Sequence, residues 1–136
     1  MGLFANFEIS GSALSAQSYR LNTTASNLAN AETIASSEAE AYRSRQPVFQ
    51  ALLANQASPG EVGVNMLGIV ESQQAVNRRY DPGHALADKD GFIFGSNVNP
   101  VEEMANMMSA SRAYQNNVEV LNTSRDLLLR VLSLGN

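Results

Sequence analysis

The sequence predicts a mainly α-helical protein with a small β insert, in which the N- and C-terminal helices pair as a coiled-coil-like hairpin beside a β-rich middle segment. Two observations predict this class. Apolar residues recur every seven positions at both ends of the chain, and the middle changes to a shorter period interrupted by Pro-Gly pairs. We therefore expect a terminal helical domain from residues 1–31 plus 99–136, and a β-containing middle segment with loops over residues 32–98.

The N-terminal helix is unusual because it carries almost no charge. Between residues 1 and 31 only Glu8 and Arg20 are ionised, and the polar face consists of Ser, Thr, Asn and Gln. Such a face suits contact with other protein on several sides. Ser10 followed by Gly11 leaves open a later helix start. The large residues of its heptad row are Phe7, Leu14, Leu21 and Leu28.

The C-terminal helix is marked by its start. Asn99 is a good N-cap, Pro100 suits the first helical position, and Glu102 lies three residues after the cap. One row of the predicted seam contains Met107, Tyr114, Leu121 and Leu128, and its companion row contains Met104, Val118 and Leu132.

A second apolar stripe follows Ala113, Val120, Leu127 and Leu134 of the same helix. Pairing with the N-terminal helix can cover only one stripe, so the other needs a second partner. A neighbouring molecule could supply that partner, and packing against the middle segment is the alternative.

The middle segment shows alternating apolar residues and turn signals. Residues 42–53, 62–71 and 91–94 are expected to be extended. Ser58-Pro59-Gly60 and Asp81-Pro82-Gly83 have the Pro-Gly order that type II turns prefer.

Composition excludes several classes of protein. The net charge is −4, which argues against nucleic acid as a partner, and the absence of Cys excludes thiolate metal sites and disulfides. No apolar run reaches the roughly 18–20 residues of a membrane span, so we expect no direct membrane insertion. The start, MGLFANFEIS, lacks the basic and apolar regions of a cleaved signal peptide.

No group of residues resembles a catalytic, metal or cofactor site. The single histidine, His84, follows a Pro-Gly pair and has no obvious partner, and Asp88-Lys89-Asp90-Gly91 fits an Asx-type turn better than a calcium loop. Arg78-Arg79 is a short basic pair that suits solvent or salt bridges. Phosphate-loop and nucleophile motifs are absent. We therefore expect no enzyme activity, no cofactor and no small-molecule substrate.

Several polar side chains on the two helices are candidates for inter-subunit contacts, because an amide can bridge two chains without burying a charge. Solvent exposure or helix capping is the alternative for each of them. The candidates are Asn27, Asn30, Arg112, Asn116, Asn117, Glu119 and Asn122.

Three stretches carry a family resemblance. The stretch from Ser26 to Thr33 resembles the N-terminal signature of flagellar rod and hook proteins, and the stretches 80–88 and 107–122 are similar to the middle and C-terminal parts of proximal rod members. Ile34-Ala35 stands where distal rod and hook members often have Gly and an aromatic residue, which favours the proximal members.

This resemblance implies a structural subunit of the proximal rod of the bacterial flagellar basal body. Such subunits assemble with copies of themselves and other rod proteins into a tubular drive shaft that transmits torque and encloses the export channel. The implied partners include the adaptor that joins the rod to the membrane ring. The implied location is the periplasmic rod, reached through the flagellar type III apparatus without a cleaved signal peptide. A soluble helical adaptor or chaperone of the flagellar export system is the alternative.

Overall fold

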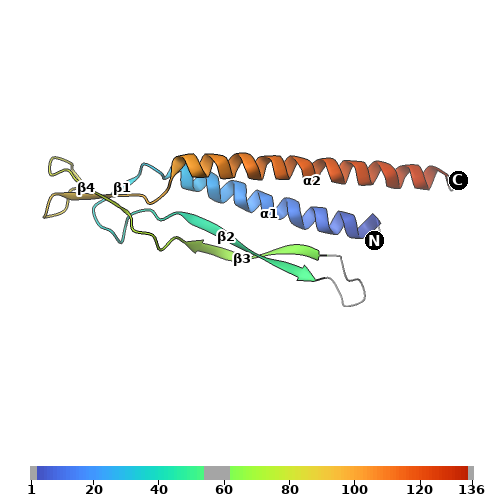
Figure 1. Cartoon of the computed structure of the whole chain (residues 1–136), viewed down its shortest axis with the longest axis horizontal. Helices are drawn as coiled ribbons and strands as arrows, with labels where there is room; N and C mark the ends of the chain where they lie inside the picture. The colour runs from blue at the N-terminus through green and yellow to red at the C-terminus, as the bar shows by residue number, and fades with distance from the viewer. Residues whose placement is uncertain (1–2, 54–61, 135–136) are drawn as a thin grey trace. The chain divides into compact units, whose positions relative to one another are not determined.

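The computed structural model describes residues 3–53 and 62–134, and it confirms two long helices that flank a middle of antiparallel strands (Figure 1). In chain order the elements are α1 (Leu3–Ala29), β1 (Ile34–Ala35), β2 (Arg45–Leu53), β3 (Val62–Glu71), β4 (Asn77–Tyr80), β5 (Phe92–Gly95) and α2 (Pro100–Leu134).

The chain divides into two compact units. The first contains the described parts of Met1–Leu21, Pro47–Gly68 and Met108–Asn136, and the second contains Asn22–Gln46 and Ile69–Met107. Both helices therefore contribute residues to each unit. The predicted domains of residues 1–31 plus 99–136 and of residues 32–98 follow element type instead, and this division stays a prediction.

Helix α1 runs without interruption through Gly11, so the alternative of a later start at Ser10 is wrong. A Cβ added at Gly11 would meet nothing within 4 Å, which shows that no close approach requires glycine there. The helix ends where expected, near Asn30. The Ser26 carbonyl in its last turn accepts both the backbone N–H of Asn30 at 3.2 Å and its side-chain amide at 2.8 Å.

Helix α2 begins at the predicted cap. The Oδ1 atom of Asn99 accepts hydrogen bonds from the N–H groups of Val101 at 3.1 Å and Glu102 at 3.4 Å. The carbonyl of Asn99 accepts the N–H of Glu103 at 3.0 Å. Pro100 has no N–H to satisfy, which suits the first position of the helix.

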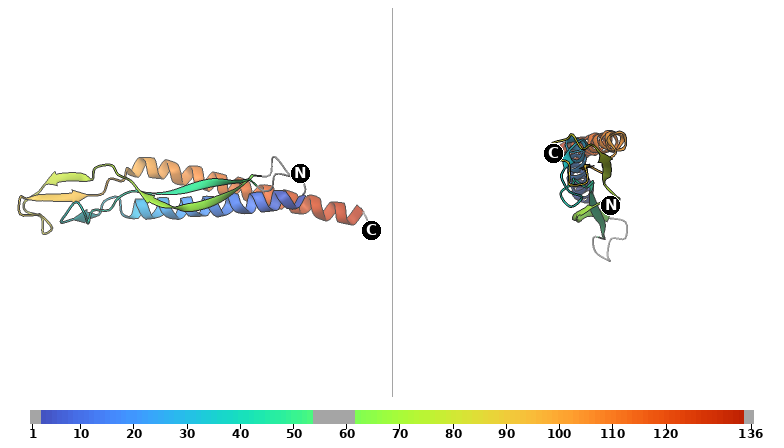
Figure 2. Two further views of the ribbon diagram at one scale, coloured as in Figure 1. Left: turned by 90° about the horizontal axis from the view of Figure 1, so that it is seen from below. Right: turned by 90° about the vertical axis from the view of Figure 1, so that its left-hand side faces the viewer.

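In the first unit, the N-terminal part of α1 lies antiparallel beside α2, and strands β2 and β3 form a two-stranded sheet (Figures 1 and 2). Ser12 connects α1 to this sheet. Its hydroxyl donates to the Ile9 carbonyl at 2.8 Å and accepts the N–H of Val64 at 3.1 Å. This contact fixes the position of β3 against α1.

The second unit contains a three-stranded antiparallel sheet of order β1-β5-β4. Its apolar centre is Ile93 on β5, which is 2% exposed. On one face of the sheet the guanidinium of Arg78 lies 3.7 Å from the centre of the Phe92 ring, and Tyr80 packs edge-on against the same ring. Strands β1 and β4 had no counterpart among the strands predicted from the sequence.

In the loop between β4 and β5, the predicted type II turn is wrong and the predicted Asx-type turn is confirmed. The His84 N–H bonds the Asp81 carbonyl at 3.2 Å, so a turn exists, but Gly83 lacks the positive φ that a type II turn needs. Asp88 forms the expected Asx-type turn, because its Oδ1 accepts the N–H groups of Asp90 and Phe92 at 2.9 and 2.8 Å. The predicted turn at Ser58-Pro59-Gly60 lies outside the described residues.

Candidate assembly surface

In the first unit, the buried residues of the two helices are small. Ala16 of α1 and Ala110 and Ser124 of α2 are buried, and Ala110 has no exposed surface. Because short side chains allow backbones to approach closely, this interior is thin and covers little apolar area. On α2 the most buried positions are spaced by seven: Glu103, Ala110 and Ser124 are buried, and Asn117 is half-buried. The predicted seam of this helix did not include this row, because its residues are small or polar and its period of seven is its only signal in the sequence.

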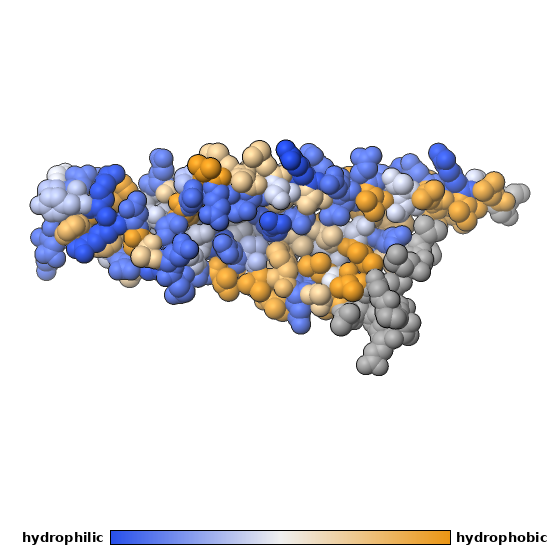
Figure 3. Space-filling model, viewed as in Figure 1, coloured by the Kyte–Doolittle hydropathy of each residue, from blue (hydrophilic) through white to orange (hydrophobic). Residues whose placement is uncertain are grey.

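The apolar residues of α2 lie largely outside this interior. We define the apolar end of α2 as residues 127–134, in which Leu128 alone is half-buried. Figure 3 shows hydrophobic surface at this end of the helix. Arg130 and Ser133 are the only polar side chains of this end, so most of its surface is apolar and needs cover by other protein. The exposed fractions are 51% for Leu127, 56% for Leu129, 58% for Val131, 60% for Leu132 and 87% for Leu134.

The predicted heptad residues divide between half-buried and exposed positions. Met104, Tyr114 and Leu132 are exposed, so within one chain they do not form the predicted seam. The small row that contains Ala110 occupies the interior in their place. The role of all these residues in assembly stays a prediction. The half-buried members are Phe7, Leu14, Leu21, Leu28, Met107, Val118, Leu121 and Leu128.

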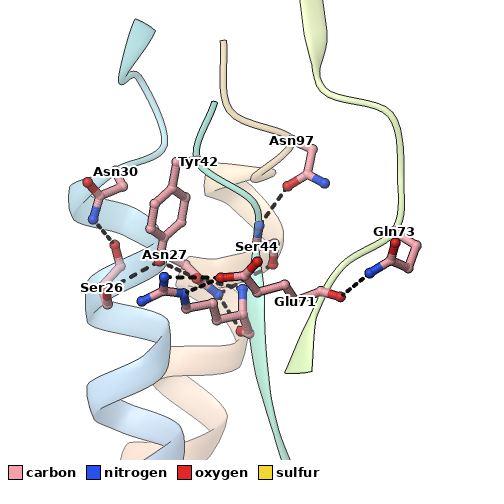
Figure 4. A network of polar contacts seen from close by, with 9 residues as sticks. Ser26, Asn27, Asn30, Tyr42, Ser44, Glu71, Gln73 and Asn97 are labelled. Carbon is pink, nitrogen blue, oxygen red and sulfur yellow. Dashed lines mark hydrogen bonds and ion pairs between the residues drawn. The ribbon is translucent and has the colours of Figure 1, made fainter. Parts of the chain in front are cut away.

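Asn27 differs from the expectation of an inter-subunit contact, because the structure buries it inside the chain with 1% exposure. Its Nδ2 donates to the Arg45 carbonyl at 2.8 Å and to Ser44 Oγ at 3.4 Å. Its Oδ1 accepts the Arg45 N–H at 2.9 Å and the Tyr42 hydroxyl at 3.0 Å (Figure 4). All four hydrogen-bonding positions of the amide are used. Asn27 therefore joins the end of α1 to the start of β2.

The same network continues to the segment before α2. The N–H of Ser44 donates to Asn97 Oδ1 at 2.7 Å (Figure 4). The Ser44 carbonyl accepts the N–H of Ser72 at 2.7 Å. Arg45 and Glu71 form an exposed ion pair at 3.1 Å across β2 and β3. Four separate segments of the second unit are thus linked by polar contacts.

The polar candidates on α2 differ from Asn27, because none of them is buried. Arg112, Asn116, Glu119 and Asn122 are exposed, and Asn117 is half-buried. Within residues 3–53 and 62–134, none of these five side chains forms a hydrogen bond or ion pair. Their polar groups are available to a neighbouring chain. Asn30, by contrast, uses its amide to cap its own helix.

The other residues singled out in the sequence have local roles. His84 Nδ1 accepts the N–H of Leu86 at 3.1 Å inside its own loop, and Arg79 lies 3.6 Å from Asp81. In the described part of the chain, no cluster of three or more His, Cys, Asp or Glu side chains could hold a metal ion. None of the helices described has the length and hydropathy of a membrane span.

Comparison with known proteins places these features in a family. Residues 7–34 match the family model described as flagella basal body rod protein, and residues 89–134 match the model for the C-terminal region of flagellar basal body rod FlgEFG proteins. Three relatives bear the name flagellar basal-body rod protein FlgC. Their sequences are 47% identical in Salmonella typhimurium, 49% in Escherichia coli O6:H1 and 45% in Yersinia enterocolitica, each with 99% of both chains covered.

Proposed function

Because the chain belongs to the FlgC family of flagellar basal-body rod proteins, we propose that the apolar end of α2 is where it joins its neighbours in the rod. The chain is a structural subunit of the flagellar basal-body rod. The observation that supports the site is that α2 buries small residues and exposes large apolar ones. Ala110 is fully buried, whereas Leu134 is 87% exposed. An apolar surface of this kind marks a protein interface.

In the assembled rod, the terminal helices pair as a coiled-coil-like hairpin, and the small row that contains Ala110 lies between them. The small interior row permits close approach of α1 and α2, and the large residues that remain outside pack against helices of adjacent subunits. Torque then passes through many close-packed contacts, which resist deformation as a protein interior does. The charge-poor surface of α1 lowers the desolvation cost of this packing.

The five polar side chains of α2 without partners in the described chain add specificity to these contacts. Asn116, Asn117 and Asn122 would bond backbone or amide groups of a neighbour, and Arg112 and Glu119 would pair with charges across the interface. An unpaired amide at a misaligned contact is costly, so such residues favour one register of neighbours.

Membership of the family also supports a proposal for the location and the partners of the subunit. The subunit lies in the proximal part of the rod in the periplasm, after export through the flagellar type III apparatus. It contacts copies of itself, other rod proteins and the adaptor between the rod and the membrane ring. It works mechanically, without catalysis, cofactor, nucleic acid or small-molecule substrate.

Imaging of isolated basal bodies at side-chain resolution tests this proposal. The expected result is density for the chain in the rod, with residues 127–134 enclosed by helices of neighbouring subunits. A chain that is absent from basal bodies and forms a stable, monodisperse oligomer in solution would contradict the proposal and favour a soluble adaptor or chaperone.

A further inference from the structure

Strand β4 is an open edge of the sheet in the second unit. It pairs with β5 on one side only, in the order β1-β5-β4. The register aligns Asn77 with Gly95 and Tyr80 with Phe92. All four residues of β4 are exposed, and Tyr80 retains 64% of its surface.

The register shows which backbone groups of β4 face outward. The N–H of Asp81 bonds the Gly91 carbonyl at 2.9 Å, and hydrogen-bonded pairs alternate along an antiparallel ladder. Asn77 and Arg79 therefore direct their backbone groups to β5. Arg78 and Tyr80 direct theirs to the open edge, where no hydrogen bond from the described residues meets them.

The side of β5 that faces away from β4 is paired within the chain. On β5, Phe94 lies opposite Ala35 of β1. The N–H and carbonyl of Phe92 are bonded by Asp88, through its Oδ1 at 2.8 Å and its backbone N–H at 2.8 Å. Both sides of β5 are therefore occupied, and of the two edge strands β4, with four residues, offers a longer edge than the two-residue β1.

A pocket lies on one face of the sheet beside this edge. Its volume is about 390 Å³, and its lining includes Arg79 of β4, Ile93 of β5 and Glu32 and Ile34 of the α1–β1 region. The opposite face presents Tyr80 and the Arg78–Phe92 pair. An open strand edge with a pocket for alternate side chains is the arrangement by which sheets bind extended peptides.

We propose that β4 binds an extended acidic segment of a partner protein as an added strand. The two arginines of β4 supply the charge complementarity. Arg78, on one face, forms no ion pair among the described residues, and Arg79, on the other face, would exchange its exposed 3.6 Å contact with Asp81 for a carboxylate of the added strand. Pairing of β4 with β4 of a second copy would oppose like charges and is disfavoured. The surface lies in the second unit, and its role does not depend on the packing of the terminal helices.

The probe for this site is an N-acetylated hexapeptide that alternates Glu and Val, added to the full chain at low concentration. We expect saturable binding that slows hydrogen exchange at the amides of Arg78 and Tyr80 and leaves the amide of Arg79, already bonded to β5, nearly unchanged. A peptide with Lys in place of Glu, or with N-methyl groups on the edge-facing amides, should bind at least about tenfold more weakly.

Two variants separate the edge from the side chains. Tyr80→Pro removes an outward N–H and the ring without removing a hydrogen bond to β5, whereas Tyr80→Ala removes the ring alone and keeps that N–H. We expect Tyr80→Pro to weaken binding by at least about tenfold relative to Tyr80→Ala, and equal affinity of the two variants would overturn the inference. Slow exchange at the Ile93 amide in both variants shows that the sheet is intact.

Three further results would overturn the inference. The first is absence of peptide binding, and the second is binding without slower exchange at Arg78 and Tyr80. The third is protection of these two amides that rises with concentration of the chain alone, which would identify a contact between copies.

Discussion

The side-chain amide of Asn27 and the backbone of Arg45 form a closed pair of hydrogen bonds, with Nδ2 donating to the carbonyl at 2.8 Å and Oδ1 accepting the N–H at 2.9 Å. The side-chain amide thus bonds both backbone groups of Arg45, as a residue of a neighbouring strand does in an antiparallel sheet. The contact joins the last turn of α1 to the first residue of β2, so a residue in the family signature supports the fold of a single chain.

Replacing Asn27 should therefore be costly. Asn27→Ala removes the partners of the Arg45 N–H and carbonyl and empties the position of a side chain that is 1% exposed, and we expect a loss of about 2–4 kcal/mol in the free energy of unfolding. Urea denaturation of the purified chain measures this loss. Asn30→Ala, which removes only a bond within its own helix end, should cost about 1 kcal/mol or less. Equal losses in the two variants would refute the role assigned to Asn27.

The apolar end of α2 should matter to the rod and not to the single chain. Leu127 is 51% exposed, so Leu127→Asp should change the free energy of unfolding of the monomer by no more than about 0.5 kcal/mol. The same variant should fail to enter the rod, because a carboxylate would be buried without a partner. Leu127→Met keeps an apolar side chain of similar volume and should assemble.

Quantification of both Leu127 variants in purified basal bodies checks this expectation, with export into the periplasm measured in parallel. Incorporation of the Asp variant at the level of the Met variant would show that this end of the helix is not enclosed by neighbours.

Gly91 should be required at the start of β5. Its φ is +81°, and an added Cβ would lie 2.9 Å from Cε2 of Tyr80. Gly91→Ala is therefore expected to destabilise the chain by about 1–3 kcal/mol in thermal or urea unfolding. Gly83→Ala is the matched control in the same loop, because Gly83 has no positive φ and the nearest atom lies 4.0 Å away. A neutral Gly91→Ala variant would contradict the geometry described for the loop.

The sequence predicted the elements that have local signals. The cap at Asn99, the end of α1 near Asn30 and the Asx-type turn at Asp88 each depend on residues within a few positions. Strand β4 has the sequence Asn-Arg-Arg-Tyr, which lacks alternating apolar residues because both of its faces are open.

The buried face of α2 and the partner of Asn27 depend on tertiary contacts, which the spacing of residues in the sequence does not reveal. A helix with several apolar rows can bury any one of them. In α2 the row with Ala110 is buried because its short side chains permit close packing, although other rows contain larger apolar residues. The partner of Asn27 lies 18 positions away, so its identity depends on the tertiary fold.

Hydrogen exchange of residues 127–134 tests most directly whether neighbouring subunits complete the terminal helices. In the dilute full-length chain, these amides should exchange rapidly while those of Ile93 and its strand remain protected, and in isolated basal bodies the same eight residues should become protected. Strong protection of residues 127–134 in the dilute monomer, together with a single sharp melting transition, would contradict the account.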